Sequence, residues 1–403
     1  MNTPTKSLLA QRILNMNESA TIAMAQKARD LAAKGHHVIS LSLGEPDFDT
    51  PDHIKEAAKQ ALDDGFTKYT PVPGLPQLRQ AIVDKFKREN QLDFDINQIV
   101  VSNGAKQSIA NLCMSLLNEG DEVIILAPYW VSYFEIVKLG GGVPVIVGAD
   151  IDQDYKVTAG QVAAAITDRT KLMIFSSPCN PTGSVYSQEE LKAIAEVIGR
   201  HEGIYIISDE IYEYINFVGD HVSIGAFESV KDRTITVNGF AKGFAMTGWR
   251  LGYIGAPLWI AKACAKIQGQ FTSGANAFSQ VAAAHALNAD KTPSRKMRDA
   301  FLKRRDLVLE KLSAIPGFKV NHPKGAFYVF PDISNFFGTK AGDREINDSN
   351  DWCMYILEEA HVAVVTGDAF GAPGCFRLSY AAAEETLIEA ISRIEKACAK
   401  LTR

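Results

Sequence analysis

The chain has 403 residues, a hydrophobic content of 46% and a formal net charge of −5 at pH 7. This length allows two or three domains, and the apolar content is ample for a large buried core. The net negative charge and the lack of a basic block in the sequence argue against nucleic acid as the main partner.

Six cysteines are scattered along the chain without CxxC or Cys/His spacing. They are Cys113, Cys179, Cys264, Cys353, Cys375 and Cys398. This usage is typical of reduced thiols rather than of a disulfide framework or a zinc site, so no metal is expected. The first residues lack a signal-peptide pattern, and no apolar run approaches the length of a membrane span. The sequence therefore predicts a cytoplasmic protein without a membrane partner.

The first part of the chain combines helices with loops. Residues 18–34 have helical periodicity, and a short strand is expected over 37–43. Residues 44–48 form a loop because they contain Gly and Pro, which break regular structure. Further helices are expected over 51–63 and 75–89.

From residue 98 onward, short apolar strands alternate with helical segments. The expected strands are 99–101, 122–126, 143–147, 171–175, 203–208 and 234–237, and the expected helices are 106–117, 131–138, 160–166 and 188–201. This alternation predicts a mostly parallel α/β sheet covered by helices on both faces. Ligands bind such sheets at the carboxyl ends of the strands.

The pattern changes near residue 290. A long charged helix is expected over 291–314, and it would link the sheet domain to a smaller α+β domain. The elements expected there are strands at 326–330 and 376–379 and helices at 351–360 and 384–400.

The stretch 236–252 reads TVNGFAKGFAMTGWRLG and holds a lone lysine, Lys242, in apolar surroundings. A buried lysine loses hydration, and its lowered pKa leaves more of the neutral amine that attacks a carbonyl. Enzymes that use pyridoxal 5'-phosphate (PLP) hold the cofactor through such a lysine. The guanidinium of Arg250 would suit the cofactor phosphate. The alternative is a surface Lys and Arg beside a Gly-rich turn.

Residues 241–253, AKGFAMTGWRLGY, closely resemble the lysine signature of the fold-type I (class I) PLP-dependent aminotransferases. The nearest resemblance is to the aspartate aminotransferase branch, which includes aspartate/prephenate aminotransferases, and it extends from about Ser7 to the last helix. It implies a large PLP-binding domain, 51–296, with a mostly parallel seven-stranded sheet between helices. It also implies a smaller α+β domain built from both chain ends, 1–50 and 297–403. Ala241 departs from the signature, which commonly has Ser or Thr there.

The resemblance assigns cofactor-binding roles to several strand ends. In DEIY at 209–212, Asp209 would hold the pyridine nitrogen protonated. Tyr212, one helical turn away, would hydrogen-bond the cofactor O3′. Asn180, in an NPTG loop, would contact both O3′ and the substrate carboxylate. The backbone at Gly104 and Ala105, at a helix N-terminus, would bind the phosphate.

Other residues are expected to bind the substrate. Arg377, in FRLSY at 376–380, resembles the arginine that holds the α-carboxylate through a bidentate fork. Gly44 would contact the same substrate through its backbone. Lys106, beside the phosphate loop, and Thr21 would bind a distal carboxylate, and Trp130 would stack on the pyridine ring.

Tyr69 resembles the tyrosine that reaches the phosphate of the neighbouring subunit, which implies a homodimer with shared active sites. At Asn17 this chain departs from relatives that use prephenate, which often carry a lysine.

These residues predict an aminotransferase that moves the amino group of L-aspartate to 2-oxoglutarate, giving oxaloacetate and L-glutamate by a ping-pong mechanism. Lys242 would be both the Schiff-base residue and the proton carrier, and Asp209 and Tyr212 would assist it. Its partners would be small amino acids and 2-oxo acids. Aromatic, prephenate or alanine-type transamination, or a PLP β-lyase reaction, remain alternatives on the same scaffold.

Overall fold

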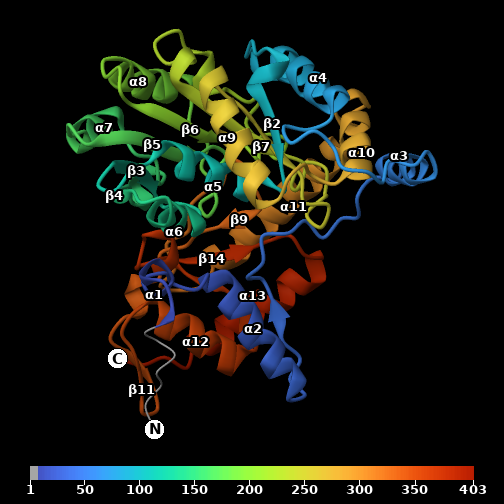
Figure 1. Ribbon diagram of the computed structural model, residues 1–403. Helices are drawn as coiled ribbons and strands as arrows, with labels where there is room; N and C mark the ends of the chain where they lie inside the picture. The colour runs from blue at the N-terminus through green and yellow to red at the C-terminus, as the bar shows by residue number, and fades with distance from the viewer. Residues whose placement is uncertain (1–7) are drawn as a thin grey trace.

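The structure is a computed structural model that describes residues 8–403. A sheet flanked by helices forms the upper part of the molecule, and a smaller group of helices and short strands lies below it (Figure 1). Helix α11 (Thr292–Ser313) runs at the junction of the two parts.

The sheet has seven strands in the order β2-β8-β7-β6-β5-β3-β4. Its neighbouring strands are parallel, except that β8 runs antiparallel to both β2 and β7. The mostly parallel sheet expected from the sequence, with the seven strands that the family resemblance implies, is therefore confirmed. The strands are β2 (Ile99–Ser102), β3 (Glu122–Ala127), β4 (Val143–Gly148), β5 (Thr170–Ser176), β6 (Tyr205–Asp209), β7 (Thr234–Gly239) and β8 (Gly252–Gly255).

Helices cover both faces of this sheet (Figure 1). The helices of this part are α3 (Asp52–Asp63), α4 (Pro76–Lys85), α5 (Ala105–Leu116), α6 (Ser132–Leu139), α7 (Ala159–Ala165), α8 (Gln188–Gly199), α9 (Leu258–Phe271) and α10 (Ala277–Asn288). Of these, α3 packs against α10 at the edge of the molecule and not on the sheet. Consecutive strand residues enter different cores: Ile206 packs with Leu191 of α8, and Ile207 packs in the cluster that contains Leu112 of α5. Each such buried side chain contributes about 1.5–3 kcal/mol, which holds the strand ends in place.

Three elements of this part were not predicted. Strand β8 has four residues and begins and ends with glycine, so its periodic signal is short. Gly252 is required because a side chain there would run into the backbone of Gly104 and Ala105. Helices α9 and α10 were also missed, and α10 is apolar on most of its surface, which hides the amphipathic pattern.

The lower part combines both ends of the chain. Strand β1 pairs in parallel with β12, and β9 and β13 flank β14 in an antiparallel sheet. Its elements are α1 (Gln11–Leu14), α2 (Ala20–Ala33), β1 (Ile39–Ser40), β9 (Tyr328–Val329), β10 (Thr339–Ala341), β11 (Arg344–Ile346), α12 (Ser349–Ala360), β12 (Val362–Ala363), β13 (Val365–Thr366), β14 (Phe376–Ser379) and α13 (Glu384–Cys398).

We propose the same division that the resemblance implies, with a small domain of 1–50 and 297–403 and a large domain of 51–296. The pairing of β1 with β12 supports it, because it joins the N-terminal and C-terminal segments. Residues 1–7 of the first range lie outside the described part of the chain.

The strand expected over 37–43 is shorter in the structure, where β1 covers only Ile39–Ser40. After this strand, backbone carbonyl groups of residues 42–44 accept hydrogen bonds from side chains of other elements. The carbonyl of Ser42 accepts a hydrogen bond from Arg377, and that of Gly44 accepts one from Lys242. The segment therefore forms a wall for the charged groups described below.

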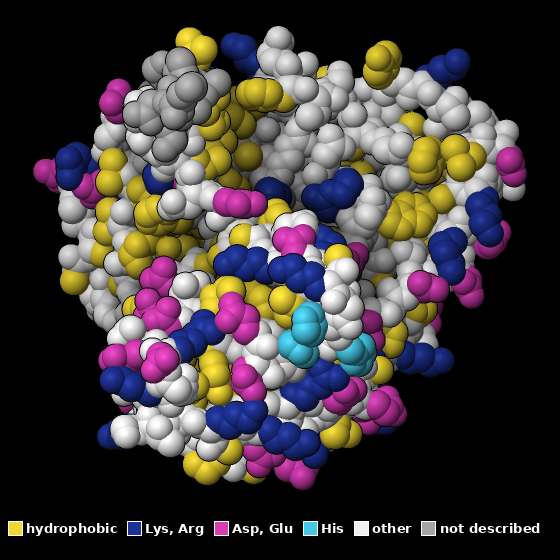
Figure 2. Space-filling view, turned by 90° about the horizontal axis from the view of Figure 1, so that it is seen from below, with side chains coloured by type: hydrophobic (Ala, Val, Ile, Leu, Met, Phe, Trp, Pro, Cys, Tyr) yellow, Lys and Arg dark blue, Asp and Glu magenta, His cyan; other side chains and the backbone are white. Residues whose placement is uncertain are grey.

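The next features concern possible membrane helices, the cysteines and the surface charge. Among residues 8–403, no helix is both long enough and apolar enough to cross a membrane. All six cysteines are buried and free. On the face that Figure 2 shows, side chains of both charges are interspersed.

A buried ionic cluster lies beside the segment that follows β6. Lys85 forms an ion pair with Glu213 and donates to Asn90 Oδ1 at 2.6 Å, and Asn90 in turn donates to Glu213 Oε2 at 2.8 Å. His221 Nε2 lies 2.9 Å from Glu210 Oε2. The two glutamates and the histidine are close enough to share a metal ion, but Lys85 already supplies positive charge to Glu213.

We expect Lys85→Met to destabilise the protein by about 3–5 kcal/mol, because it leaves the Glu213 carboxylate buried without its partner. Equilibrium unfolding in denaturant measures this change. Lys59→Met is the matched control, because the Lys59–Glu56 pair is 67% exposed on both sides and should contribute little. The account of the cluster is wrong if both variants unfold at the same denaturant concentration.

Candidate functional site

A cavity of about 290 Å³ lies at the carboxyl ends of β5 and β6, between the sheet and the lower part of the molecule. Every site residue predicted from the sequence, except Tyr69, lines it. These are Thr21, Gly44, Gly104, Ala105, Lys106, Trp130, Asn180, Asp209, Tyr212, Lys242, Arg250 and Arg377. The structure thus brings together residues that are far apart in the sequence.

Lys242 projects into this cavity from the loop after β7. Its ammonium donates to the Gly44 carbonyl and lies 5.8 Å from the ring centre of Tyr212. Burial lowers the pKa of Lys242 to about 8, and the nearby Arg377 guanidinium adds to the effect. A sizeable fraction of this amine is therefore neutral near pH 7–8, as a nucleophile or a base requires.

Asp209 is the last residue of β6 and is buried. Burial raises its pKa to about 6, although a hydrogen bond from the Tyr133 hydroxyl opposes the shift. That bond is 2.7 Å long and ends on Oδ2, while the Ile211 amide donates to Oδ1 at 3.3 Å. Asp209 is the only carboxylate among the residues that line the cavity.

Tyr212 also points into the cavity, but the expected helical turn between Asp209 and Tyr212 is wrong. Residues 211–214 form turns rather than a helix. Glu210 and Glu213, which alternate with the two cavity residues, take part in the buried ionic cluster instead. The Tyr212 hydroxyl lies 2.7 Å from that of Tyr328.

Arg377, in β14, is 2% exposed and stacks over the rings of Tyr328 and Phe370 at 4.6 and 5.0 Å. It donates to Asn180 Oδ1 at 2.9 Å and to the Ser42 carbonyl, but its Nε has no partner. Burial lowers its pKa. A buried guanidinium without a carboxylate partner is suited to bind an anion.

Lys106 lies on the first turn of α5 and is exposed at the cavity wall. Its ammonium is 5.1 Å from the ring centre of Trp130. Loss of hydration lowers its pKa, and the Arg250 guanidinium lowers it further. On the opposite segment, the Thr21 hydroxyl is buried without a hydrogen-bond partner.

Residues around Arg250 form a cradle suited to a phosphate group. The N-terminus of the 12-residue helix α5 presents free amides at Ala105 and Lys106. Gly104 has a φ of +85°, and a Cβ there would collide with the Arg250 guanidinium. Arg250 itself has a φ of +57°, a strained conformation of the kind that clusters at functional sites.

The donor set of the cavity fits PLP. The cradle offers amides and a guanidinium for its phosphate, Lys242 offers an amine for its aldehyde, and Asp209 offers a carboxylate for its ring nitrogen. The indole of Trp130 offers a flat apolar face. Ala241 supplies no hydroxyl, so the phosphate would have one donor fewer than the signature commonly provides.

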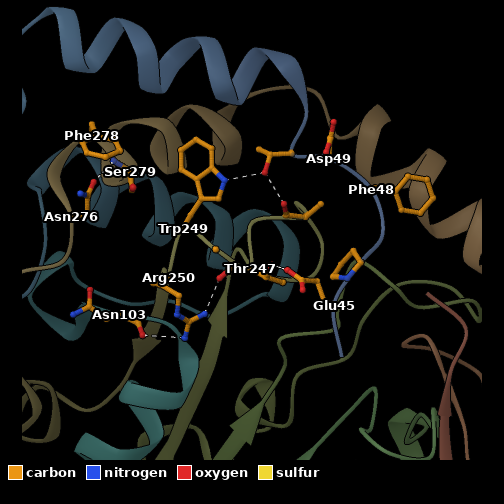
Figure 3. A pocket seen from close by; sticks show the side chains of 14 residues that line it. Glu45, Phe48, Asp49, Asn103, Thr247, Trp249, Arg250, Asn276, Phe278 and Ser279 are labelled. Atoms are coloured by element: carbon orange, nitrogen blue, oxygen red, sulfur yellow. Dashed lines mark hydrogen bonds between the residues drawn. The ribbon is translucent and has the colours of Figure 1, made fainter. Parts of the chain in front are cut away.

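Tyr69 is the one predicted site residue that lies elsewhere. Its side chain is 99% exposed and lines a separate surface hollow with Gly274 and Phe278. A further open hollow of about 760 Å³ adjoins Arg250 (Figure 3). In this hollow Arg250 donates to the Thr247 carbonyl at 2.9 Å, and Trp249 Nε1 donates to Thr50 at 3.0 Å.

Sequence reasoning missed two tyrosines of the cavity. Tyr328 lies in the strand expected at 326–330, and Tyr133 lies three residues after Trp130. The spacing of Tyr133 places it one turn beyond Trp130, which was the available signal. Nothing in the sequence pairs either tyrosine with its partner across the fold.

Comparisons with known proteins agree with this geometry. The chain is 47% identical to an aspartate/prephenate aminotransferase of Cereibacter sphaeroides over 98% of this chain and 100% of that protein. It is also 47% identical to an aspartate aminotransferase of a Bacillus species, over 97% and 99% of the two chains.

Solved structures give the same result. An aspartate aminotransferase from Rhizobium meliloti matches with a TM-score of 0.95 at 42% identity, over 98% of this chain and 99% of that one. The Thermus thermophilus aspartate aminotransferase with maleate matches with a TM-score of 0.91 at 43% identity, over 96% and 99%. The family model described as aminotransferase class I and II covers residues 36–394. The chain therefore belongs to the class I and II aminotransferase family, as an enzyme of its PLP-dependent, aspartate aminotransferase branch.

Proposed function

We propose that this enzyme transfers the amino group of L-aspartate to 2-oxoglutarate and gives oxaloacetate and L-glutamate. The amino group is held by the enzyme between two half-reactions, so the kinetics are ping-pong. The relatives that carry the names aspartate and aspartate/prephenate aminotransferase support this proposal.

The observation that carries the proposal is the charge of the cavity. Lys106, Lys242, Arg250 and Arg377 all line it, and none of them forms an ion pair with a carboxylate of residues 8–403. Asp209 is the only carboxylate that lines the cavity, and Glu45, next to Gly44, also acts on Lys242, so the four cations still outnumber the nearby carboxylates. A cofactor phosphate and a substrate with two carboxylates would supply the missing negative charge.

The phosphate cradle and Lys242 hold the cofactor in this proposal. Arg250 and the amides of Ala105 and Lys106 would bind the phosphate, Asn180 and Tyr212 would bind O3′, and Trp130 would offer its indole to the ring. The Asp209 carboxylate would keep a proton on the ring nitrogen. When bound, PLP supplies an electron-accepting ring that stabilises negative charge at the substrate Cα.

The substrate is held at both of its ends. Arg377 binds the α-carboxylate as a bidentate fork, next to the backbone of Gly44. Lys106 and the unpartnered hydroxyl of Thr21 bind the distal carboxylate. Fixing both ends would set the orientation of the bonds at Cα, and this would favour proton loss over decarboxylation. Lys242, as the neutral amine, would accept the Cα proton as a general base and then donate it to C4′ as a general acid.

We further propose a cytoplasmic homodimer. Six free buried cysteines are typical of a reducing compartment. The exposed position of Tyr69, away from the cavity of its own chain, supports a role in the partner subunit. The open hollow next to Arg250 (Figure 3) offers space for such a contribution.

Prephenate transamination is a second candidate, because many of the relatives carry this activity in their names. An aromatic aminotransferase from Pyrococcus horikoshii is also similar, with a TM-score of 0.85 at 41% identity over 92% of this chain and 98% of that one. Aspartate, prephenate and aromatic amino acids share the α-carboxylate, so the groups beyond Arg377 must decide between them. Rates measured separately with each substrate distinguish these candidates.

We expect Lys106→Met to lower kcat/KM for aspartate by about 10- to 100-fold, because a charge-assisted hydrogen bond is lost. The rate with alanine, which has no distal carboxylate, should change little. Steady-state kinetics with both donors, at saturating PLP, measure the difference. An equal loss for both donors would place Lys106 in cofactor binding alone.

The lowered pKa of Lys242 gives a prediction for the apoprotein. Labelling of Lys242 by an amine-directed reagent, followed by mass spectrometry of the peptide, should accelerate as pH rises through about 8. The neutral amine reacts and its fraction grows through the pKa, so the rate rises with pH. Continued acceleration to pH 10 or above, with no plateau, would show that the amine is not desolvated.

Shared active sites are tested by mixing two defective chains. Tyr69→Ala and Lys242→Ala homodimers should each have little activity. Co-expression of the two should restore about a quarter of wild-type activity, because half of the dimers gain one intact site. No restoration, despite heterodimers seen by native mass spectrometry, would show that Tyr69 does not act across the interface.

A further inference from the structure

Tyr133 connects two groups of the cavity that are far apart in the sequence. It lies in α6, on the wall of the cavity, and its side chain is fully buried. Its hydroxyl donates to Asp209 Oδ2 at 2.7 Å. Its ring meets that of Trp130 edge to face, with the centres 5.4 Å apart and the planes at 87°. One side chain therefore touches both the carboxylate and the flat aromatic ring.

The hydrogen bond from Tyr133 is the shorter of the two that hold the Asp209 carboxylate. The other comes from the Ile211 amide at 3.3 Å, which is long for such a bond. Removing the phenol would leave Oδ2 without the donor it has in this structure. Asp209 would then be held on one oxygen only.

The phenol of Tyr133 is the donor in its hydrogen bond to Asp209. Burial raises its pKa well above the ordinary value, and the Asp209 carboxylate raises it further. The phenol therefore keeps its proton near neutral pH. A neutral donor stabilises the ionised form of a carboxylate over the protonated form.

We propose that Tyr133 is a positioning residue of this site, which keeps the Asp209 carboxylate ionised and aimed into the cavity while its ring supports Trp130. This inference rests on the proposed role of Asp209 toward the cofactor ring nitrogen. Tyr133 itself touches no reacting atom in the proposal.

The groups around Asp209 define the expected change. Burial and the Glu210 carboxylate raise its pKa, and Tyr133, the Ile211 amide and Lys242 lower it. Removing the Tyr133 hydroxyl takes away an opposing contribution, so the pKa of Asp209 rises. A smaller share of the carboxylate is then ionised near neutral pH, and the enzyme should bind PLP more weakly there.

The test is Tyr133→Phe, which removes the hydroxyl and keeps the ring against Trp130. We expect the PLP dissociation constant at pH 7, from titration of the apoprotein followed by absorbance, to increase about tenfold. In both proteins the affinity for PLP should fall as the pH is lowered. The midpoint, the pH at which half of this affinity change has occurred, should be about one unit higher in the variant. A structural role alone would not move this midpoint.

Tyr186→Phe is the matched control. Tyr186 is also buried in the sheet part, and its hydroxyl accepts from the Val157 amide at 2.9 Å, but it does not line the cavity. It should lose a similar amount of stability and leave PLP affinity and its pH midpoint unchanged. Equal effects of the two substitutions on the midpoint would overturn the proposal.

Asp209→Ala separates this inference from the proposed function. If Asp209→Ala weakens PLP binding and Tyr133→Phe does not, the role of Tyr133 is wrong while that of Asp209 stands. If Asp209→Ala leaves PLP binding unchanged, the role of Asp209 fails and the inference fails with it. Circular dichroism of all three variants confirms that each is folded.

Discussion

Four cationic side chains, Lys106, Lys242, Arg250 and Arg377, converge on a cavity that has one carboxylate, Asp209. Like charges at close range repel one another, so other groups must hold them in place. Backbone carbonyls and aromatic rings take this part, rather than carboxylates. The charge excess is therefore available to anionic ligands, and their binding would stabilise the folded protein.

The parallel sheet makes this convergence possible. The buried strands are held by apolar packing on both faces, and their carboxyl ends carry Asp209 and the loops of Asn180 and Lys242. Arg377 comes from the other part of the molecule, where β14 is paired with β9 and β13. The large part thus supplies the proposed cofactor groups, and the part built from both chain ends supplies the proposed substrate anchor.

Much of the fold followed from the alternation of strands and helices between residues 98 and 240, because buried parallel strands are short continuous apolar runs between amphipathic helices. Strand β8 and helix α10 were not predicted. Strand β8 is short and bounded by glycine, and helix α10 is apolar on most of its surface. The cavity residues followed from motifs whose members lie at strand ends. Tyr133 and the Lys85–Glu213 pair did not, because their partners are 76 and 128 residues away in the sequence.

Residues 209–213, DEIYE, contribute both to the cavity and to the buried ionic cluster. Asp209 and Tyr212 face the cavity, while Glu210 and Glu213 enter a buried ionic cluster. Turns at residues 211–214 direct these side chains to different sides, whereas the sequence had suggested a helical turn there. The ionic cluster therefore holds the segment whose other side chains, Asp209 and Tyr212, line the cavity.

The most direct test of this account is the visible spectrum of the PLP-bound enzyme, recorded while single amino acids are added without any 2-oxo acid. The account predicts that L-aspartate and L-glutamate shift the cofactor band from about 420 nm to about 330 nm, and that the Lys242→Ala variant does not respond. A shift with aromatic or neutral amino acids alone would contradict the proposed roles of Lys106 and Thr21. Absence of any cofactor band in the wild-type enzyme would contradict the account as a whole.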